Sequence, residues 1–310
     1  MQRRALIATL AAPPLAAPAL ARAQPAPRLV VPFAAGGPTD VVARMLAQSM
    51  GALVENRAGG AGLPATEHVA RAPKDGSVLL FTTVIHAVHR ALHGARLTFD
   101  PIADFAPAAL IGVVPMVILV RPDGPADLPS LLAMLRAQPG QHSYGSSGVG
   151  GSSHLGVELL KAMAGVDIAH VPYRGTAPAL ADLLAGRVLL VMDSVATGAP
   201  QVRQGALRAL ATTAERRSAA LPEVPLVAET VPGFAATTWN AVLAPAGTPA
   251  GVVEGVSAAC ARFARDAARR LAELGVQVPD DMSPGATTRF VAEETRKWEG
   301  LIARAGIRAE

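Results

Sequence analysis

The sequence predicts an α/β protein built as two lobes with a cleft between them. Apolar segments of strand length alternate with amphipathic helical segments through most of the chain, an order typical of α/β folds with mainly parallel sheets. Two segments rich in proline and glycine, 120–130 and 230–249, follow strands and can carry the chain from one lobe to the other. With 310 residues, of which 51% are hydrophobic, the chain is long enough to build both cores.

Eight apolar segments have the length and residue types of strands. They span 28–33, 77–83, 115–120, 141–147, 167–173, 187–193, 207–213 and 239–245. Helical segments lie between several of them, at 39–50, 128–138, 152–165 and 177–186. If the two Pro/Gly-rich segments are hinges, residues 122–239 form an inserted lobe, and residues 24–121 together with 240–310 form the other. Clefts between such lobes are favoured sites for small molecules.

The C-terminal part of the chain predicts helices that pack by one face. Across 252–275, apolar residues recur at helical spacing and include Cys260, which we expect to be a small buried hydrophobe. Across 283–306, a Ser–Pro start predicts a docking helix whose apolar stripe comprises Phe290, Val291, Trp298, Leu301 and Ile302. A single cysteine allows no disulfide within the chain and no cysteine-based metal site.

The first residues have the three parts of a secretory signal peptide. The charged start MQRR precedes an Ala-rich apolar segment, and residues 21–23 have the small-residue pattern of a cleavage site before Gln24. Arg3 and Arg4 leave twin-arginine export as a minor alternative to the general secretory (Sec) route. We therefore expect residues 1–23 to be removed and the mature protein to be soluble and periplasmic.

Charge and aromatic content argue against nucleic acid as a partner. The net charge is +4, but the arginines are scattered and form no basic stripe. Aromatic residues make up only 4% of the chain, so they offer few surfaces on which bases could stack. We expect no nucleic-acid binding, no cofactor and, after the leader, no segment that spans a membrane.

The segment GGPTD, residues 36–40, opens a predicted helix directly after the first strand. Its glycines allow a tight turn, and Pro38 suits the first helical turn, where a missing N–H costs nothing. The unpaired amides of that turn can hold an anion, so the segment is either a turn without a ligand or part of an anion site. We expect Asp40 to be a local cap rather than a ligand contact.

A second Gly/Ser-rich segment, residues 143–160, again follows a strand and opens a helix. It lacks the lysine of a phosphate-binding P-loop and the last glycines of a dinucleotide motif and of a nucleophile elbow. One interpretation is a flexible surface loop. The same strand–loop–helix arrangement in both predicted lobes favours a ligand site.

Catalysis is the less favoured interpretation of this second segment. Ser146 or Ser147 would need a histidine held by an acid, and His154 on the following helix is one of several histidines that could lie nearby by chance. No carboxylate completes a metal site around the clustered His86, His89 and His93. We expect no metal, and we expect His86 and His89 to supply polar groups near the cleft or to lie on a solvated face.

Asp193 ends an apolar strand. A carboxylate at this position either caps the next turn or faces the crevice at the carboxyl ends of the strands. Both interpretations stay open at the level of sequence.

In their order along the chain, these segments resemble the substrate-binding proteins of tripartite tricarboxylate transporters, also called Bug receptors. The resemblance runs from about residue 29 to 249 and rests on VPFAAGGPTDVVARMLA, VENRAGGAG, DGSVLLFTT, FDPIADFAP, the long segment from Tyr144, LRALATT and PGFAATTWNAVLAPAGTP. It implies a periplasmic binding protein fold of type II, with two α/β lobes joined by a hinge. It also implies a receptor, not an enzyme, that captures a di- or tricarboxylate, an acidic amino acid or an aromatic carboxylate.

The resemblance further implies which residues hold the ligand, because the family binds one carboxylate through backbone amides and hydroxyls of two Gly-rich loops. Those roles fall here on Phe33, Ala34, Ala35, Gly36, Gly37, Thr39, Ser146, Ser147 and Gly148. Asp193 matches a family position that lines the cleft, and His86 completes the set as a polar group near it. Three features depart from the family pattern: a shortened segment before Val54, Ala34 in place of a common proline, and His89 in place of a usual asparagine.

The expected partners are a small carboxylate and the membrane subunits of a tripartite tricarboxylate transporter, with the receptor itself a monomer. Two alternatives remain. One is a secreted serine hydrolase that uses Ser146 or Ser147. The other is a receptor that reports its ligand to a signalling partner instead of feeding a transporter.

Overall fold

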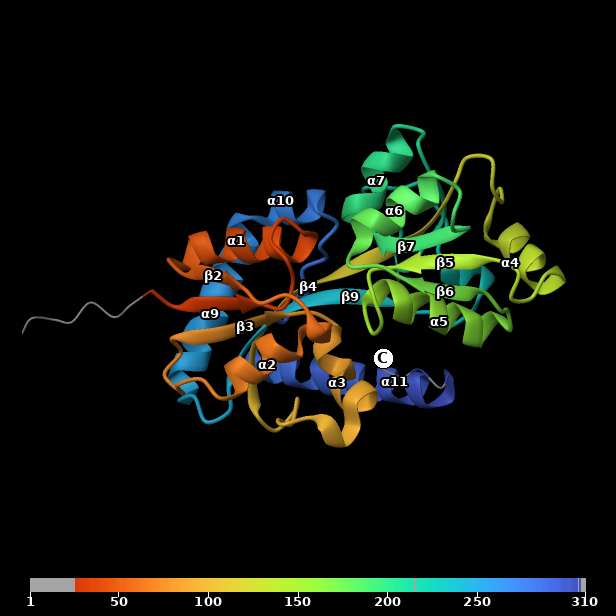
Figure 1. Cartoon of the computed structure of the whole chain (residues 1–310). Coiled ribbons are helices and arrows are strands. Elements are labelled where there is room, and N and C mark those ends of the chain that lie inside the picture. The colour runs from red at the N-terminus through yellow and green to blue at the C-terminus, as the bar shows by residue number, and fades with distance from the viewer. Residues whose placement is uncertain (1–25, 215, 306, 308–310) are drawn as a thin grey trace, which may run out of the picture.

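The computed structural model describes residues 26–214, 216–305 and 307. The predicted signal peptide and its cleavage site lie outside these residues. Two groups of strands and helices lie end to end, and two strands, β4 (Phe105–Val120) and β9 (Thr237–Pro245), run through the middle of the molecule (Figure 1). Within the described ranges, no helix combines the length and apolar character needed to cross a membrane.

The first lobe is built from both ends of the chain, as its colours show (Figure 1). Its strands are β1 (Arg28–Val31), β2 (Leu53–Asn56) and β3 (Val78–Thr82). Its helices are α1 (Pro38–Met50), α2 (Leu63–Ala70), α3 (Ile85–His93), α9 (Ala250–Asp266), α10 (Ala268–Glu273) and α11 (Pro284–Ala305), with short 3₁₀ turns η1 (Gly60–Gly62) and η2 (Gly94–Arg96).

The second lobe comes from the middle of the chain. Its strands are β5 (Ser143–Ser146), β6 (Ala169–Pro172), β7 (Leu190–Ser194) and β8 (Arg208–Thr212). Its helices are α4 (Leu128–Ala137), α5 (Ser152–Ala164), α6 (Thr176–Leu184), α7 (Val195–Arg203) and the short α8 (Val227–Thr230).

Strand β4 belongs to both lobes. The strand order is β2-β1-β3-β9-β4-β7-β5-β6, and β8 also pairs with β4. From Phe105 to Pro115, β4 pairs with β9; from Met116 to Val120, it pairs with β7 and β8. The chain therefore passes from one lobe to the other where β4 changes its partners. The lobe boundaries predicted at 121/122 and 239/240 remain predictions.

All eight predicted strands are present, but the prediction of mainly parallel pairing was wrong. Of the pairings that the described residues make, β1–β2, β1–β3, β5–β6 and β5–β7 are parallel. The pairings β3–β9, β4–β7, β4–β8 and β4–β9 are antiparallel. The antiparallel half arises because β4 and β9 run against their neighbours in both lobes. Their pairing partners cannot be inferred from an alternation of strands and helices alone.

Alternate side chains of β1 and β3 point to opposite faces of the sheet and belong to different hydrophobic clusters. In β1 and β3, Val30 and Leu80 face one cluster, whereas Leu29, Val31 and Phe81 face another. This is the two-residue alternation of a strand buried on both faces. The first cluster is continuous across both lobes, since it also contains residues of α4, α5 and α11. A third cluster fills the other face of the second lobe.

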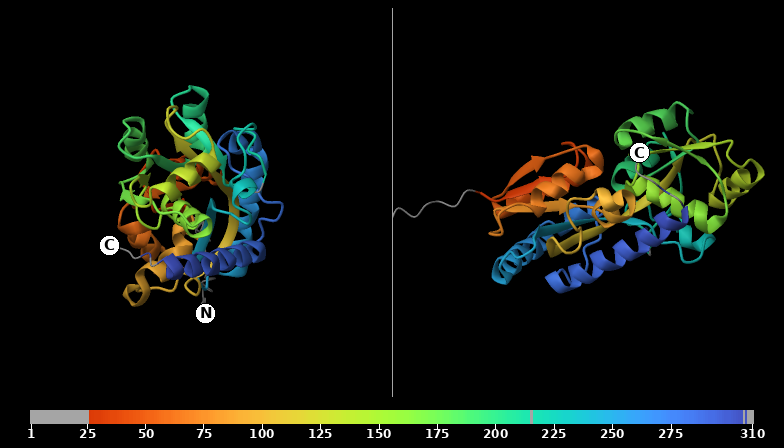
Figure 2. Two further views of the ribbon diagram at one scale, coloured as in Figure 1. Left: turned by 90° about the vertical axis from the view of Figure 1, so that its right-hand side faces the viewer. Right: turned by 60° about the horizontal axis from the view of Figure 1, so that its bottom comes forward.

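Helix α11 fastens the end of the chain to this shared core, as its predicted apolar stripe indicated. Val291, Trp298, Leu301 and Ile302 are buried, and the helix lies along α3 toward α5 (Figure 2). Oε2 of buried Glu294 accepts hydrogen bonds from Nε1 of Trp298 at 2.8 Å and from Nε1 of Trp239 on β9 at 3.1 Å. One carboxylate thus ties α11 to β9.

Cys260 is also buried, as predicted, in a helical region that is interrupted at Ala267 between α9 and α10.

We expect Glu294→Leu to lower the free energy of unfolding by about 3 kcal/mol, because two buried indole N–H groups lose their acceptor. Urea unfolding followed by circular dichroism would measure the loss. The matched control is Glu293→Leu at the exposed neighbouring position, which should change little. Equal effects of the two substitutions would contradict the role assigned to the Glu294 carboxylate.

Candidate ligand-binding site

The two Gly-rich segments follow strands that lead toward the middle of the molecule from opposite sides (Figure 1). We call residues 32–37 the first glycine loop and residues 146–151 the second glycine loop. The second loop touches the opposite lobe. A Cβ added at Gly150 would overlap Cδ1 of Leu92 and come within 3.8 Å of Val88, both on α3. The candidate site therefore lies where the lobes meet.

The first glycine loop is held by Asp40, in the first turn of α1. Gly36 adopts φ +88° and donates its amide hydrogen to Oδ2 of Asp40 at 2.8 Å. Arg44 Nε donates to the same oxygen at 2.7 Å. Burial raises the pKa of Asp40, but hydrogen bonds from Arg44, Gly36 and Asn56 outweigh it, so the pKa is below its ordinary value. Asp40 thus has local partners, but it holds the loop before the helix and caps no amide of α1, whereas Pro38 starts the helix as predicted.

Asn56 completes this support, and the sequence analysis did not identify it. Its Nδ2 lies 2.7 Å from Oδ1 of Asp40 and 3.0 Å from the carbonyl of Phe33. Asn56 ends β2, which is parallel to β1, so the ends of the two strands meet at one edge of the sheet. The signal in the sequence was an amide residue ending a strand next to the loop, but β2 itself had not been predicted.

The second glycine loop is held by its own hydroxyls and by hydrogen bonds to α5, to β6 and to the turn after β6. Ser147 donates its amide hydrogen to Oγ of Ser153 at 2.8 Å, and the two hydroxyl oxygens are 2.9 Å apart. The Gly148 amide donates to Oγ of Ser146 at 3.1 Å. The loop also contacts the turn after β6, where Gly175 donates to the carbonyl of Ser147 at 3.2 Å. The amides of Gly36, Ser147 and Gly148, predicted as ligand donors, therefore all have acceptors within the protein.

The remaining predicted contacts of the first loop are open to solvent. Ala34, Ala35 and Gly36 are exposed, and Phe33, Gly37 and Thr39 are half-buried. Neither glycine loop contains lysine or arginine. An anion at this place would therefore find no cation within either loop, and its partners would be the remaining amides and hydroxyls and the starts of α1 and α5.

Asp193 ends β7 and is buried. It accepts hydrogen bonds from the Ser194 amide at 2.7 Å and from the Thr197 hydroxyl at 2.5 Å, so it caps the turn into α7. Burial raises the pKa of Asp193 to about 6 against hydrogen bonds from Thr197, Ser194 and Thr176. The corner after β7 also contacts the first lobe, because a Cβ at Gly275 would lie 3.6 Å from Val195. Capping and a place near the lobe junction are both features of this residue.

His86 does not lie on a solvated face, and neither does His89, so that interpretation was wrong. Both side chains are fully buried, since this face of α3 packs against the loop that contains Pro101. Nε2 of His86 lies 2.7 Å from the Pro101 carbonyl oxygen, and its ring meets Phe105 edge-on. Burial lowers the pKa of His86 to about 4. A ligand contact by His86 would require the ring to leave this position.

Ser146 has a histidine partner, although it is not the one that the sequence suggested. Its Oγ lies 2.6 Å from Nε2 of His170 on β6, while His154 stacks on the His170 ring. A serine–histidine pair is part of a hydrolase site. However, Ser146 is fully buried and its oxygen already accepts the Gly148 amide, so it does not present an accessible nucleophile. Among the described residues, no group of three or more metal-binding side chains is placed to hold an ion.

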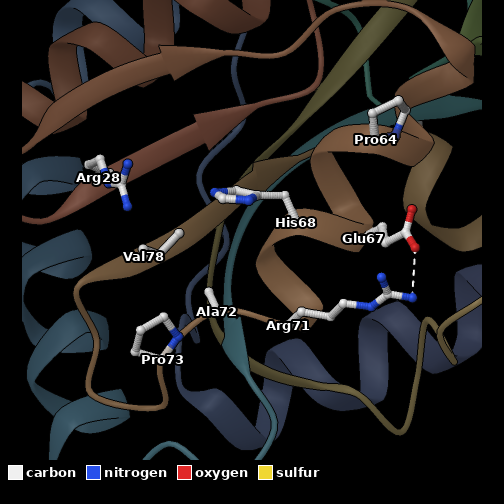
Figure 3. A pocket seen from close by; sticks show the side chains of 8 residues that line it. All are labelled: Arg28, Pro64, Glu67, His68, Arg71, Ala72, Pro73 and Val78. Carbon is white, nitrogen blue, oxygen red and sulfur yellow. Dashed lines mark ion pairs between the residues drawn. The ribbon is translucent and has the colours of Figure 1, made fainter.

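One cavity of about 440 Å³ lies away from both glycine loops. Arg28 and Val78, at the starts of β1 and β3, line it together with Glu67, His68 and Arg71 of the α2 region (Figure 3). Arg71 pairs with Glu67 at 2.8 Å, and Arg28 pairs with Glu55 at 3.3 Å. Because the loops follow the opposite ends of the strands and the cations here are paired, this cavity does not compete with the glycine loops as an anion site.

Comparison with known proteins covers nearly the whole described chain. The sequence model of the family described as "Tripartite tricarboxylate transporter family receptor" matches residues 38–307. Protein BugT of Bordetella pertussis (strain Tohama I) is 33% identical over 310 residues, which cover 95% of this chain and 94% of that protein. The predicted resemblance to Bug receptors is thereby confirmed.

Two solved structures with bound ligands are also similar. Rpa4515 of R. palustris with adipate is 34% identical, has a TM-score of 0.84, and the match covers 92% of this chain and 98% of that one. MatC (Rpa3494) of Rhodopseudomonas palustris with bound malate is 33% identical, has a TM-score of 0.80, and the match covers 89% and 98%. The predicted α/β fold with two lobes is confirmed.

The contact of Gly150 with α3 predicts that Gly150→Ala destabilises the protein by about 2–4 kcal/mol, through backbone strain at φ +76° and overlap with Leu92. The control is Gly165→Ala, which has a similar φ of +62° but open space around the new methyl group. It should lose only about 1 kcal/mol. In a Leu92→Ala background, Gly150→Ala should cost only the part due to backbone strain. Urea unfolding of the wild type, the three single variants and the double variant would show whether it does.

Burial of a neutral His86 predicts a loss of stability in acid. Since its pKa falls from 6.5 to about 4 on folding, the unfolded chain binds a proton that the folded one does not as the pH drops from 6.5 to 4. We expect the wild type to lose about 3 kcal/mol relative to His86→Gln over this range. The raised pKa of Asp193 makes the protein more stable as the pH falls, but Asp193 is present in both proteins, so its contribution cancels in the comparison. Urea unfolding at successive pH values, with His142→Gln as control, tests this; parallel curves would contradict it.

Proposed function

This chain belongs to the tripartite tricarboxylate transporter receptor family, and from that membership we propose that it captures a small organic carboxylate between its lobes. The observation that carries the proposal is that relatives of the same fold, at 33–34% identity over almost their whole length, hold malate and adipate. Both are dicarboxylates. The candidate site of this chain has the chemistry such an anion needs, without a metal or a cofactor.

The two glycine loops would bind one carboxylate of the ligand through dipoles alone. A micromolar affinity corresponds to about 8 kcal/mol. Hydrogen bonds to a charged group supply about 1.5–3 kcal/mol each, and two helix starts add about 1–2 kcal/mol together. A few hydroxyls and amides, enclosed when the lobes close, are therefore sufficient. Neutral donors also avoid a buried, unpaired cation when no ligand is bound.

The internal bonds of the loops set what the ligand must do. The Gly36 amide already donates to Asp40. In the first lobe, a ligand carboxylate would therefore accept hydrogen bonds from the Thr39 hydroxyl and from other amides of the exposed part of the loop. In the second lobe, the Ser147 hydroxyl is half-buried and lies near the start of α5, so we assign it as a ligand donor. We place Asp193 at the far end of the ligand, where its carboxylate would accept a hydrogen bond from a ligand hydroxyl or ammonium group.

We also propose the setting in which this capture occurs. The leader would direct export through the general secretory route, and the monomeric receptor would deliver its ligand to the membrane subunits of a tripartite transporter. A hinge motion along β4 would close the lobes over the ligand. Ester hydrolysis is not expected, because Ser146 is buried and hydrogen-bonded, and the Ser147 hydroxyl pairs with the hydroxyl of Ser153, which is no general base. Delivery to a signalling partner is the alternative that a pull-down with membrane fractions would distinguish.

The direct test is a thermal shift of the purified protein against malate, adipate, citrate, other di- and tricarboxylates, nicotinate and acidic amino acids. A ligand present at a hundred times its dissociation constant should stabilise the native state by about 2.7 kcal/mol, which raises the melting temperature by a few degrees. Neutral amides of the same acids are the matched controls. If no carboxylate in the panel stabilises the protein, the proposal fails.

Substitutions in the loops should separate binding from stability. We expect Ser147→Leu to abolish the carboxylate-induced shift while leaving the fold intact, because the hydroxyl is lost and a bulky group fills its place. Gly36→Val should also abolish the shift, because a branched side chain disfavours φ +88° and changes the loop conformation, whereas the open space around Gly36 avoids a clash with the rest of the fold. Cys260→Ser, in the core of the first lobe, should lower stability by about 1–3 kcal/mol and leave affinity unchanged. The reverse pattern would show that the loops are not the site.

A further inference from the structure

Three aromatic rings are stacked behind the second glycine loop. The ring of His170 stacks against those of Tyr144 and His154, with centroids 4.9 Å and 4.1 Å away and interplanar angles of 23° and 19°, and the Tyr144 and His154 centroids are 6.5 Å apart. Tyr144 is fully buried and donates its hydroxyl hydrogen to Oε1 of Glu158 at 2.7 Å. Glu158 is itself paired with Lys161 at 3.0 Å. The stack is therefore anchored on β5, β6 and α5 together.

The two imidazoles of this stack bind the two ends of the loop. Nε2 of His170 lies 2.6 Å from Oγ of Ser146, the residue at which the loop begins. Nδ1 of His154 accepts the amide hydrogen of Gly150, near the loop's end, at 3.1 Å. His154 is 4% exposed, and burial together with the nearby His170 and Lys161 lowers its pKa to about 3. It is thus neutral at physiological pH, which leaves Nδ1 free to act as an acceptor.

The loop needs anchors of this kind because its own backbone is permissive. Gly148 and Gly150 adopt φ values of +125° and +76°, which only glycine adopts readily. Glycine also loses more conformational entropy on folding than any other residue, so a glycine-rich loop is costly to order. Gly150 is also the point of contact with Leu92 on α3 of the first lobe. A fixed spacing between the two imidazoles therefore sets both the shape of the loop and its position against the other lobe.

We propose that His154 and His170 act as a pair of positioning residues, which hold the second glycine loop in the conformation that receives the ligand carboxylate. This inference rests on the proposed function for the ligand's identity as a carboxylate, but the ordering of the loop can be measured without any ligand. Neither histidine touches the ligand; they act through Ser146 and Gly150.

Paired variants separate ring stacking from hydrogen bonding. His154→Phe keeps a flat ring in the stack but removes the acceptor for the Gly150 amide. His154→Asn loses most of the ring but places Oδ1 near the position of Nδ1. In the same way, His170→Phe removes the partner of Ser146, and His170→Gln restores a polar group near Nε2. The control is His142→Asn. The imidazole of His142 is partly exposed and hydrogen-bonds Gln138 in the same lobe.

The first measurement is hydrogen–deuterium exchange of peptides that cover residues 145–156, in the full-length mature protein without ligand. We expect His154→Phe to speed exchange of the loop amides about tenfold, the factor that corresponds to loss of one hydrogen bond of a buried amide. His154→Asn should return exchange to within about twofold of the wild type, and His142→Asn should leave it unchanged. Unchanged loop exchange in both His154→Phe and His170→Phe would overturn the inference.

The second measurement is binding of malate and adipate by isothermal titration calorimetry. For a probe that binds the wild type, affinity should fall about tenfold in His154→Phe and recover in His154→Asn, with melting temperatures recorded to exclude unfolding. Loss of affinity in both variants, or in neither, would contradict positioning through the Gly150 amide. If the wild type binds no carboxylate in the panel, the proposed function fails, and the exchange experiment still decides the role of the histidines.

Discussion

One continuous strand is shared by the two lobes, and the rest of the structure is arranged around it. Along β4, residues 105–115 pair with β9 and residues 116–120 pair with β7 and β8, so the backbone hydrogen bonds of one element hold both sheets. Neither lobe can shift along the strand without breaking these bonds. Relative motion is thereby confined to bending or twisting near Pro115, where the pairing changes. The strands that carry the glycine loops are tied to this common element, β1 through β3 and β9, and β5 through β7.

The main hydrophobic cluster adds to this constraint. Its members come from β1 and β3 in the first lobe, from α4 and α5 in the second, and from α11, which runs along both. Separate domains commonly share small and polar interfaces, which favours large relative motions. A core that continues from one lobe to the other favours small ones. The lobes are therefore better described as two ends of one folded unit, in which the second glycine loop itself packs against Leu92 of the first lobe.

Much of this could be inferred from the sequence, because the elements that carry strong local signals formed as predicted. The eight apolar segments became strands, Pro38 began α1, and the stripe containing Trp298 packed against the core. Strand β2 and the first half of β4 were missed. Leu53 is exposed in β2, so that strand has little apolar character of its own, and residues 105–114 include proline and glycine, which are poor strand formers.

The site was harder to predict than the fold, because its contacts join residues far apart in the chain. The positions of both loops followed from the strand–loop–helix pattern, whereas Asp40 holds the first loop instead of capping α1. Asn56 and His170 each hold one loop from the parallel strand beside the one that carries it: Asn56 is on β2, next to β1, and His170 is on β6, next to β5. Only the strand order brings each residue near its loop. The burial of His86 could not be predicted either. A histidine on a short helix looks solvent-exposed in the sequence, and nothing near it in the chain indicates that the Pro101 carbonyl is its hydrogen-bond partner.

The shared carboxylate between β9 and α11 has a consequence for how this molecule can be observed. The chain has two tryptophans, and both indoles donate to the same oxygen of Glu294. Neither belongs to a glycine loop. Their fluorescence emission should respond to changes in the packing of α11 on β9, beside the strand that joins the lobes. The protein thus carries an intrinsic optical reporter of bending at its junction, one that needs no attached dye.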